Sequence, residues 1–163
     1  MAAHFGHPAA AIRAHEEVFS YWASLRGEAP VPARGRLDPR DMTRHLPTMS
    51  LTEVLPGEAI DYRIRLAGTA LYNVYGREIT GRRLGEVYNS AAADYWREEL
   101  GRIVHEKRPG VGVHNLAWRG ASHLSIVWLR LPLSTRGDGR VDMILGYDAI
   151  LGLGHVPSGI RAA

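Results

Sequence analysis

The chain contains no cysteine, and this absence excludes a disulfide framework, a thiolate metal site and a cysteine nucleophile. Long apolar runs are missing as well, since no stretch approaches the ~18 apolar residues that a membrane-spanning helix needs. The first residues also lack the charged start and apolar core of a secretory signal. We therefore expect a cytoplasmic protein without a membrane segment.

Lysine is nearly absent too, because Lys107 is the one lysine among 20 basic residues, and the formal net charge is only +3. The arginines are scattered along the chain rather than gathered in a block. Arg63 and Arg65 on an exposed strand face could form a patch with Arg82 and Arg83 in a loop, but no motif that reads RNA or DNA accompanies them. We therefore expect no nucleic-acid partner.

The hydrophobic fraction, 45% of 163 residues, suits a single globular core. Helical spacing begins after an N-terminal tail and predicts a helix over residues 9–26. Its apolar stripe consists of Val18, Tyr21, Trp22 and Leu25. A short second helix should start at Asp38, whose carboxylate can cap free amides, and end before Pro47.

From residue 48 the hydrophobic period changes to two, which predicts strands over residues 50–55 and 60–66 joined by a Pro-Gly turn. Helices are expected over residues 70–75 and about 90–107. Three further strands are expected at about 111–118, 123–133 and 141–151. The glycine-containing connections between these last strands predict an antiparallel meander.

The order of these elements, and several phrases at matching spacing, resemble a PAS domain, and more closely a branch of stand-alone bacterial PAS proteins. The phrases are YWASLRG at residues 21–27, DP at 38–39, LP at 46–47, YRIRLAGTAL at 62–71, YGREITG at 75–81, LPL at 131–133 and VDMILG at 141–146. Their joint order carries the resemblance, which spans most of the chain.

The resemblance implies an α+β fold, with a PAS-like five-stranded antiparallel sheet, helices on one face and an N-terminal flanking helix. The expected layout is a flexible N-terminal tail over residues 1–8, flanking helices over 9–47, the PAS core over 48–151 and a C-terminal tail over 152–163. The implied function is sensing and regulation without enzymatic activity or an output domain of its own. Such a regulator binds a small molecule, a protein partner or both, and a separate signalling protein reads its state.

The resemblance also implies a pocket between the sheet and the helices. Tyrosine hydroxyls in an apolar cavity would provide the few polar anchors that ligand pockets use, although each residue taken alone fits ordinary core packing equally well. The candidate lining residues are Ile64, Leu66, Tyr72, Tyr75, Tyr88, Trp128 and Leu145.

The identity of a ligand is not implied. Without cysteine, neither the flavin photoadduct of light-sensing PAS domains nor a chromophore thioester can form. Haem is not expected either, because His105 lies beside the apolar stripe of its helix, next to Glu106 and Lys107. No metal site is expected, since His4, His7 and His15 have no cysteine or carboxylate to complete a ligand set.

An alternative is a small cone-shaped α+β enzyme, an isomerase or dehydratase acting on a small apolar substrate. Its proton-transfer candidates are the strand residues Asp142, Asp148 and His114. No nucleophile elbow, phosphate-binding loop or zinc signature accompanies them.

A homodimer is the expected assembly, formed through Val18, Tyr21, Trp22 and Leu25 of the N-terminal helix. The strand over residues 123–133 is apolar on both sides, so one of its faces needs a cover in addition to the core. That cover is either the helix of the same chain or the helix of a second copy.

Overall fold

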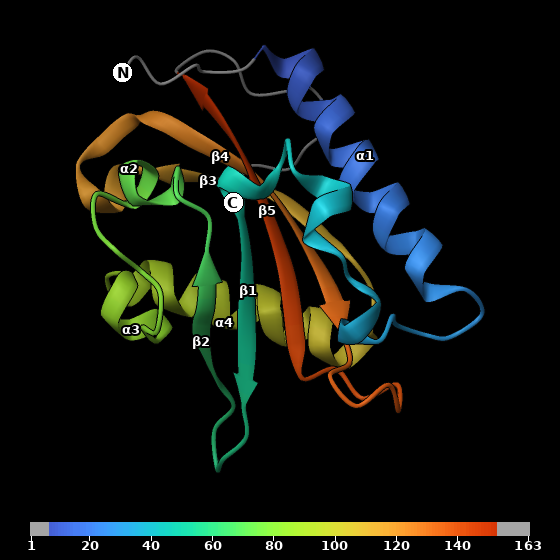
Figure 1. Ribbon diagram of the computed structural model, residues 1–163. Helices are drawn as coiled ribbons and strands as arrows, with labels where there is room; N and C mark the ends of the chain where they lie inside the picture. Colours follow the sequence, from blue (N-terminus) through green and yellow to red (C-terminus); the bar gives the residue numbers. More distant parts are fainter. Residues whose placement is uncertain (1–6, 153–163) are drawn as a thin grey trace.

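The computed structural model describes residues 7–152 (Figure 1). Helix α1 (Pro8–Arg26) begins one residue earlier than expected, because the His7 ring accepts a hydrogen bond from the Ala9 amide at 3.2 Å and Pro8 suits the first helical position. A connector and one short helix were expected between α1 and the first strand. The structure has three short 3-10 turns there: Arg34–Arg36, Pro39–Met42 and Leu46–Thr48. Asp38 caps the second turn by accepting from the Arg40 amide.

A single five-stranded antiparallel sheet forms the centre of the molecule, in the order β2-β1-β5-β4-β3. Its strands are β1 (Met49–Leu55), β2 (Asp61–Ala67), β3 (Gly110–Leu116), β4 (Ala121–Leu133) and β5 (Met143–Gly152). The last three strands pair in sequence as a meander. Strand β5 also pairs with β1, so it lies at the centre of the sheet. The expected α+β PAS fold is confirmed.

Helices cover both faces of this sheet (Figure 1). One face carries α2 (Leu71–Tyr75), α3 (Leu84–Val87) and α4 (Ser90–Glu106). The four-residue α3 was not expected, because a single helical turn leaves no periodic pattern to detect. The opposite face carries α1, so the N-terminal helix packs on the chain's own sheet. Within residues 7–152 no helix is at once long and apolar enough to cross a bilayer.

The central strands are buried on both faces, as the two-sided apolar pattern of β4 predicted. Ile126 and Trp128 face α2–α4, whereas Val127, Leu129 and Leu131 face α1. Each face therefore has a hydrophobic core of its own, and α1 completes the second one. Removing that helix would expose apolar surface at a cost of roughly 25 cal/mol per Å².

Trp22 contributes most visibly to this cover, since it is only 2% exposed and its indole Nε1 donates to the Pro132 carbonyl at 2.8 Å. We expect Trp22→Ala to lower the free energy of unfolding by about 3–5 kcal/mol, because it leaves a cavity and an unpaired carbonyl. Urea titration followed by far-UV circular dichroism measures this. Ser20→Ala, at an exposed position of the same helix, is the control and should change stability by less than about 0.5 kcal/mol. Equal losses would show that α1 does not rest on the sheet in this way.

Candidate functional site

A small cavity of about 20 Å³ lies between the sheet and helices α2–α4. Its polar lining comes from Ser50 and Thr52 on β1, Tyr75 on α2 and Tyr88 directly after α3. The remaining lining residues include apolar side chains of all three helices. A space of this size holds about one water molecule. The interior at the position expected for a ligand pocket is therefore almost filled by side chains.

A buried ion pair forms one wall of this cavity. Arg130 of β4 and Asp148 of β5 lie 2.7 Å apart, Nη1 to Oδ1, with side chains only 7% and 2% exposed. Arg130 stands opposite Gly146 in the strand register. A Cβ on Gly146 would lie 3.1 Å from Arg130 Nη1 and 2.4 Å from Ser50 Oγ, so glycine provides the room that the guanidinium occupies.

Two tyrosines extend the ion pair into a chain of hydrogen bonds. The Tyr88 hydroxyl donates to the Tyr75 hydroxyl at 3.1 Å, and the Tyr75 hydroxyl donates to Asp148 Oδ2 at 3.3 Å. On its other side the guanidinium of Arg130 lies over the indole of Trp96, 4.8 Å from the ring centroid. Five elements thus meet at one polar cluster: α2, the end of α3, α4, β4 and β5.

The protonation states in this cluster follow from burial and charge. Burial raises the pKa of both Tyr75 and Tyr88 well above the usual range, and the Asp148 carboxylate adds to the effect. Burial is the largest single effect on Arg130 and opposes its charge, but the charge and hydrogen bond of Asp148 act together with the two tyrosines, and the net effect raises the pKa of the guanidinium. The tyrosines are therefore neutral donors, and Arg130 stays charged.

His114 on β3 stands beside the cluster within an aromatic group. Its ring stacks on Tyr95 with centroids 4.7 Å apart and planes 8° from parallel. Burial lowers the pKa of His114 to about 4. Among the contacts of residues 7–152, no hydrogen-bond partner faces its Nε2, nor the indole Nε1 of Trp96 or Trp118.

Four of the expected pocket residues are buried in the core between the sheet and helices α2–α4: Ile64, Tyr75, Tyr88 and Trp128. Ile64, Tyr75 and Tyr88 line the small cavity. Trp128 instead lies over β3, where Gly112 provides space for its indole, and its Nε1 donates to the Tyr95 hydroxyl at 2.9 Å.

The expectation that they line the pocket was wrong for the other three residues, Leu66, Tyr72 and Leu145. Leu66 is 59% exposed, because a bulge in β2 pairs Leu51 with Leu66 but Thr52 with Ile64 and so turns Leu66 to the other face. Tyr72 is 55% exposed, since the one-turn helix α2 buries Leu71, Val74 and Tyr75 and leaves Tyr72 outside. Leu145 is buried, but against α1, since Ile144 is the β5 neighbour that faces α2–α4.

The residues expected at a dimer interface have partners within the chain. Val18 and Trp22 are buried against the sheet, and Leu25 is half-buried. The Tyr21 hydroxyl accepts from the Asp38 amide at 2.9 Å and donates to Asp41 at 3.1 Å, which ties α1 to the following turns. Self-association stays a prediction. In this arrangement, a second copy would meet the exposed Ile12 and Phe19 of α1 rather than Val18 and Trp22.

Two of the three proton-transfer candidates of the alternative function, Asp142 and Asp148, are held in structural contacts. The Asp148 carboxylate is occupied by Arg130 and Tyr75. The Asp142 carboxylate accepts from the amide and the hydroxyl of Thr135, and so holds the turn between β4 and β5. These contacts account for both carboxylates without a substrate.

Sequence reasoning missed Arg130 as a site residue. A signal was present, because Arg130 lies inside the apolar run of residues 127–133, and a charged side chain buried in such a run requires a charged or hydrogen-bonding partner.

The depressed pKa of His114 predicts a specific pH dependence of stability. As the pH falls below about 6.5, the unfolded chain gains a proton at this ring that the folded chain gains only near pH 4. The contribution of neutral His114 to the free energy of unfolding is therefore complete above about pH 6.5. It is lost as the pH falls from 6.5 toward 4, with a loss of about 2 kcal/mol at pH 5. Urea unfolding at pH 7 and pH 5 should show this loss in the wild type and a smaller loss in His114→Phe. His123→Gln alters an exposed histidine and should keep the wild-type loss; an unchanged loss in His114→Phe would contradict the assignment.

This architecture was compared with known protein families, curated proteins and solved structures. The family model PAS_5, described as a PAS domain, matches residues 11–148. A comparison with curated proteins finds no significant match.

Among solved structures, the Rhodobacter sphaeroides LOV protein is 16% identical with a TM-score of 0.49, over 76% of this chain and 71% of that chain. A fungal LOV domain photoreceptor is 22% identical with a TM-score of 0.47, over 82% of this chain and 89% of that chain. A domain of an HTR-like protein from Haloarcula marismortui is 12% identical with a TM-score of 0.45, over 62% and 96%.

The family match begins within α1 and ends within β5 at Asp148, so it includes β1–β4, the first part of β5, α2–α4, most of α1 and the buried ion pair. The chain is therefore a PAS-type sensory domain and belongs to the PAS domain family.

Proposed function

We propose that this PAS domain is a regulator that responds to contact with a partner protein rather than to a resident cofactor. The observation that carries the proposal is the cavity of about 20 Å³ at the pocket position. Sites for drug-sized ligands and cofactors occupy about 300–1,000 Å³. A haem or a flavin has no room between this sheet and these helices without displacement of the aromatic side chains around Arg130.

The polar cluster supports a mechanical role for the filled interior. It connects Tyr75 on α2, Tyr88 after α3 and Trp96 on α4 to the ion pair between β4 and β5. A displacement of any of these helices therefore changes the contacts of a charged pair that is almost completely buried. Buried charges tolerate loss of a partner poorly, so the cluster favours discrete arrangements over gradual deformation.

The reverse face of the same strands carries α1. There His15 Nε2 lies 2.9 Å from the Val127 carbonyl, and the Trp22 indole donates to the Pro132 carbonyl. Both carbonyls belong to β4 and lie on either side of the segment that carries Trp128 and Arg130. Helices on one face and α1 on the other thus share strands β4 and β5. A partner that prefers one arrangement of either layer shifts the population of the whole domain.

This function needs no catalytic group, and the chemistry of the interior agrees with that. The acidic candidates Asp142 and Asp148 serve as hydrogen-bond acceptors for neighbouring groups. We therefore propose that the domain has no enzymatic activity.

The first test is native mass spectrometry of the full chain directly after purification, together with its absorption spectrum. We expect the mass of the polypeptide, alone or in multiples, and no visible absorption, because the closed interior leaves no space for a cofactor. A retained organic molecule, or a Soret band that His105→Ala removes, would overturn the proposal.

The second test addresses the coupling between the two helical layers. Tyr88→Phe removes the hydroxyl that bonds to Tyr75, at a stability cost of about 1 kcal/mol. We expect it to shift backbone amide resonances of α1, on the far face of the sheet, in ¹⁵N–¹H correlation spectra. Tyr72→Phe removes an exposed hydroxyl from α2 and is the matched control. If only resonances near residue 88 move in Tyr88→Phe, the layers are not coupled through the cluster.

A further inference from the structure

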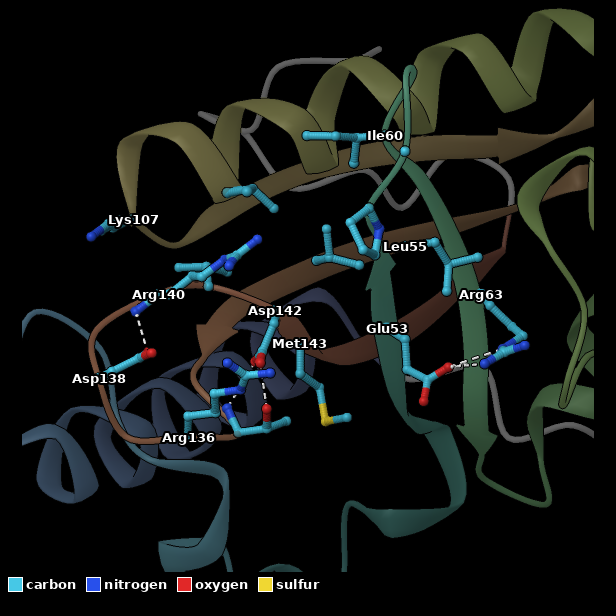
Figure 2. Close-up of a pocket in the computed structure, with 16 residues that line it drawn as sticks. Glu53, Leu55, Ile60, Arg63, Lys107, Arg136, Asp138, Arg140, Asp142 and Met143 are labelled. Carbon is cyan, nitrogen blue, oxygen red and sulfur yellow. Dashed lines mark hydrogen bonds and ion pairs between the residues drawn. The ribbon is translucent and has the colours of Figure 1, made fainter.

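A large groove lies at one end of the sheet, separate from the interior cluster, and we refer to it as the end groove. It has a volume of about 870 Å³. Its walls are the end of β1 with the β1–β2 turn, the last turn of α4, and the connection from β4 into β5 (Figure 2). Apolar side chains contribute much of the lining, including Val54, Leu55, Ile60, Val104 and Met143.

The acidic side chains of the end groove already have partners. Glu53 binds Arg63 at 2.7 Å and Arg65 at 2.8 Å. Asp142 accepts from Thr135, and Asp138 accepts from the Ser134 hydroxyl and the Arg140 amide. These carboxylates are thus engaged in holding the walls of the groove.

In contrast to these carboxylates, three cationic side chains of the lining have no charged partner among the described residues. Within residues 7–152, Lys107, Arg136 and Arg140 form no ion pair with any acidic side chain. Figure 2 shows Lys107 and Arg140 toward one end of the groove and Leu55 and Ile60 toward the other. Ile60 is itself 51% exposed. The groove therefore offers unpaired positive charge beside accessible apolar surface.

The backbone at Lys107 adds a second observation. This residue ends α4 with φ at 54°, a left-handed conformation that helices usually reserve for glycine. It is the one non-glycine residue with positive φ in the part of the chain that the structure describes. A lysine at such a position carries a conformational cost, and strained backbone of this kind clusters at functional sites.

We propose that the end groove binds an extended segment of a partner protein that carries both acidic and apolar side chains. Its carboxylates would pair with Lys107, Arg136 and Arg140, and its apolar side chains would cover Leu55 and Ile60. A phosphate backbone fits less well, because it carries no apolar side chains to cover Leu55 and Ile60. The inference rests on the proposed function, since it specifies the chemistry of the partner.

The probe is a short fluorescein-labelled peptide of alternating glutamate and leucine, and the matched control peptide has lysine in place of glutamate. We expect the acidic peptide to raise fluorescence anisotropy on binding to the full chain, with affinity falling as salt is added. Its amide shift changes should fall on residues of the end groove. Binding of both peptides alike, or shifts confined to another surface, would overturn the proposal.

Variants separate recognition from folding. Lys107→Gly should weaken peptide binding about threefold, and Lys107→Gly with Arg140→Gln about tenfold. The glycine should also raise the melting temperature by about 3 °C, because it relieves the left-handed strain. Arg77→Gln removes an exposed arginine outside the groove and should leave binding unchanged. Unchanged binding in the double variant would contradict the assigned site.

The two proposals fail in different ways. A resident ligand found by native mass spectrometry would remove the partner-driven function, whatever the peptide does. Absence of peptide binding by a chain that carries no ligand would remove only the end groove as the docking surface. RNA that competes with the peptide at this site would count against the acidic segment.

Discussion

The ion pair between Arg130 and Asp148 is the constraint on which the rest of the interior depends. Two charges removed from water are tolerated only when each is paired and its remaining hydrogen-bonding positions are filled. Gly146 leaves the space for the guanidinium, Tyr75 donates to the carboxylate, and Trp96 covers the cation with its ring. The positions of α2, α3 and α4 are therefore adjusted to one polar contact as well as to apolar packing.

The second constraint is the apolar character of β4 and β5 on both faces. Trp128 and Ile144 require cover from α2–α4, while Leu131 and Leu145 require it from α1. Sequence alternation alone allowed α1 of either the same chain or a second copy to provide this cover. The contact of Trp22 with Pro132 shows the helix on its own sheet. The flanking helix is consequently part of the fold, and its outward side carries the exposed Ile12 and Phe19.

Most of the fold could be predicted from the sequence, because hydrophobic period, proline and glycine positions act locally. Site residues depend on longer-range facts. Leu66 was assigned to the wrong face because one bulged residue in β2 reverses the alternation that places Ile64 correctly. Tyr72 was misplaced because a five-residue helix has too few turns to define a face. The pairing of Arg130 with Asp148 depends on the register of two strands, and neither strand contains that information by itself.

In the proposed function recognition takes place at the surface, and the end groove lies beside the connection between the two strands that carry the ion pair. The connection that supplies Arg136 and Arg140 joins β4 to β5, the two strands that carry the ion pair. The Asp142 carbonyl also accepts from the Val54 amide, so the same connection is fixed to β1. A partner segment that bridges Lys107 on α4 and Arg140 on this connection would hold the helical layer against the sheet at one end. Such a contact would stabilise one arrangement of α4 over β4 and β5, and the buried pair beneath Trp96 would respond to it without any ligand entering the core.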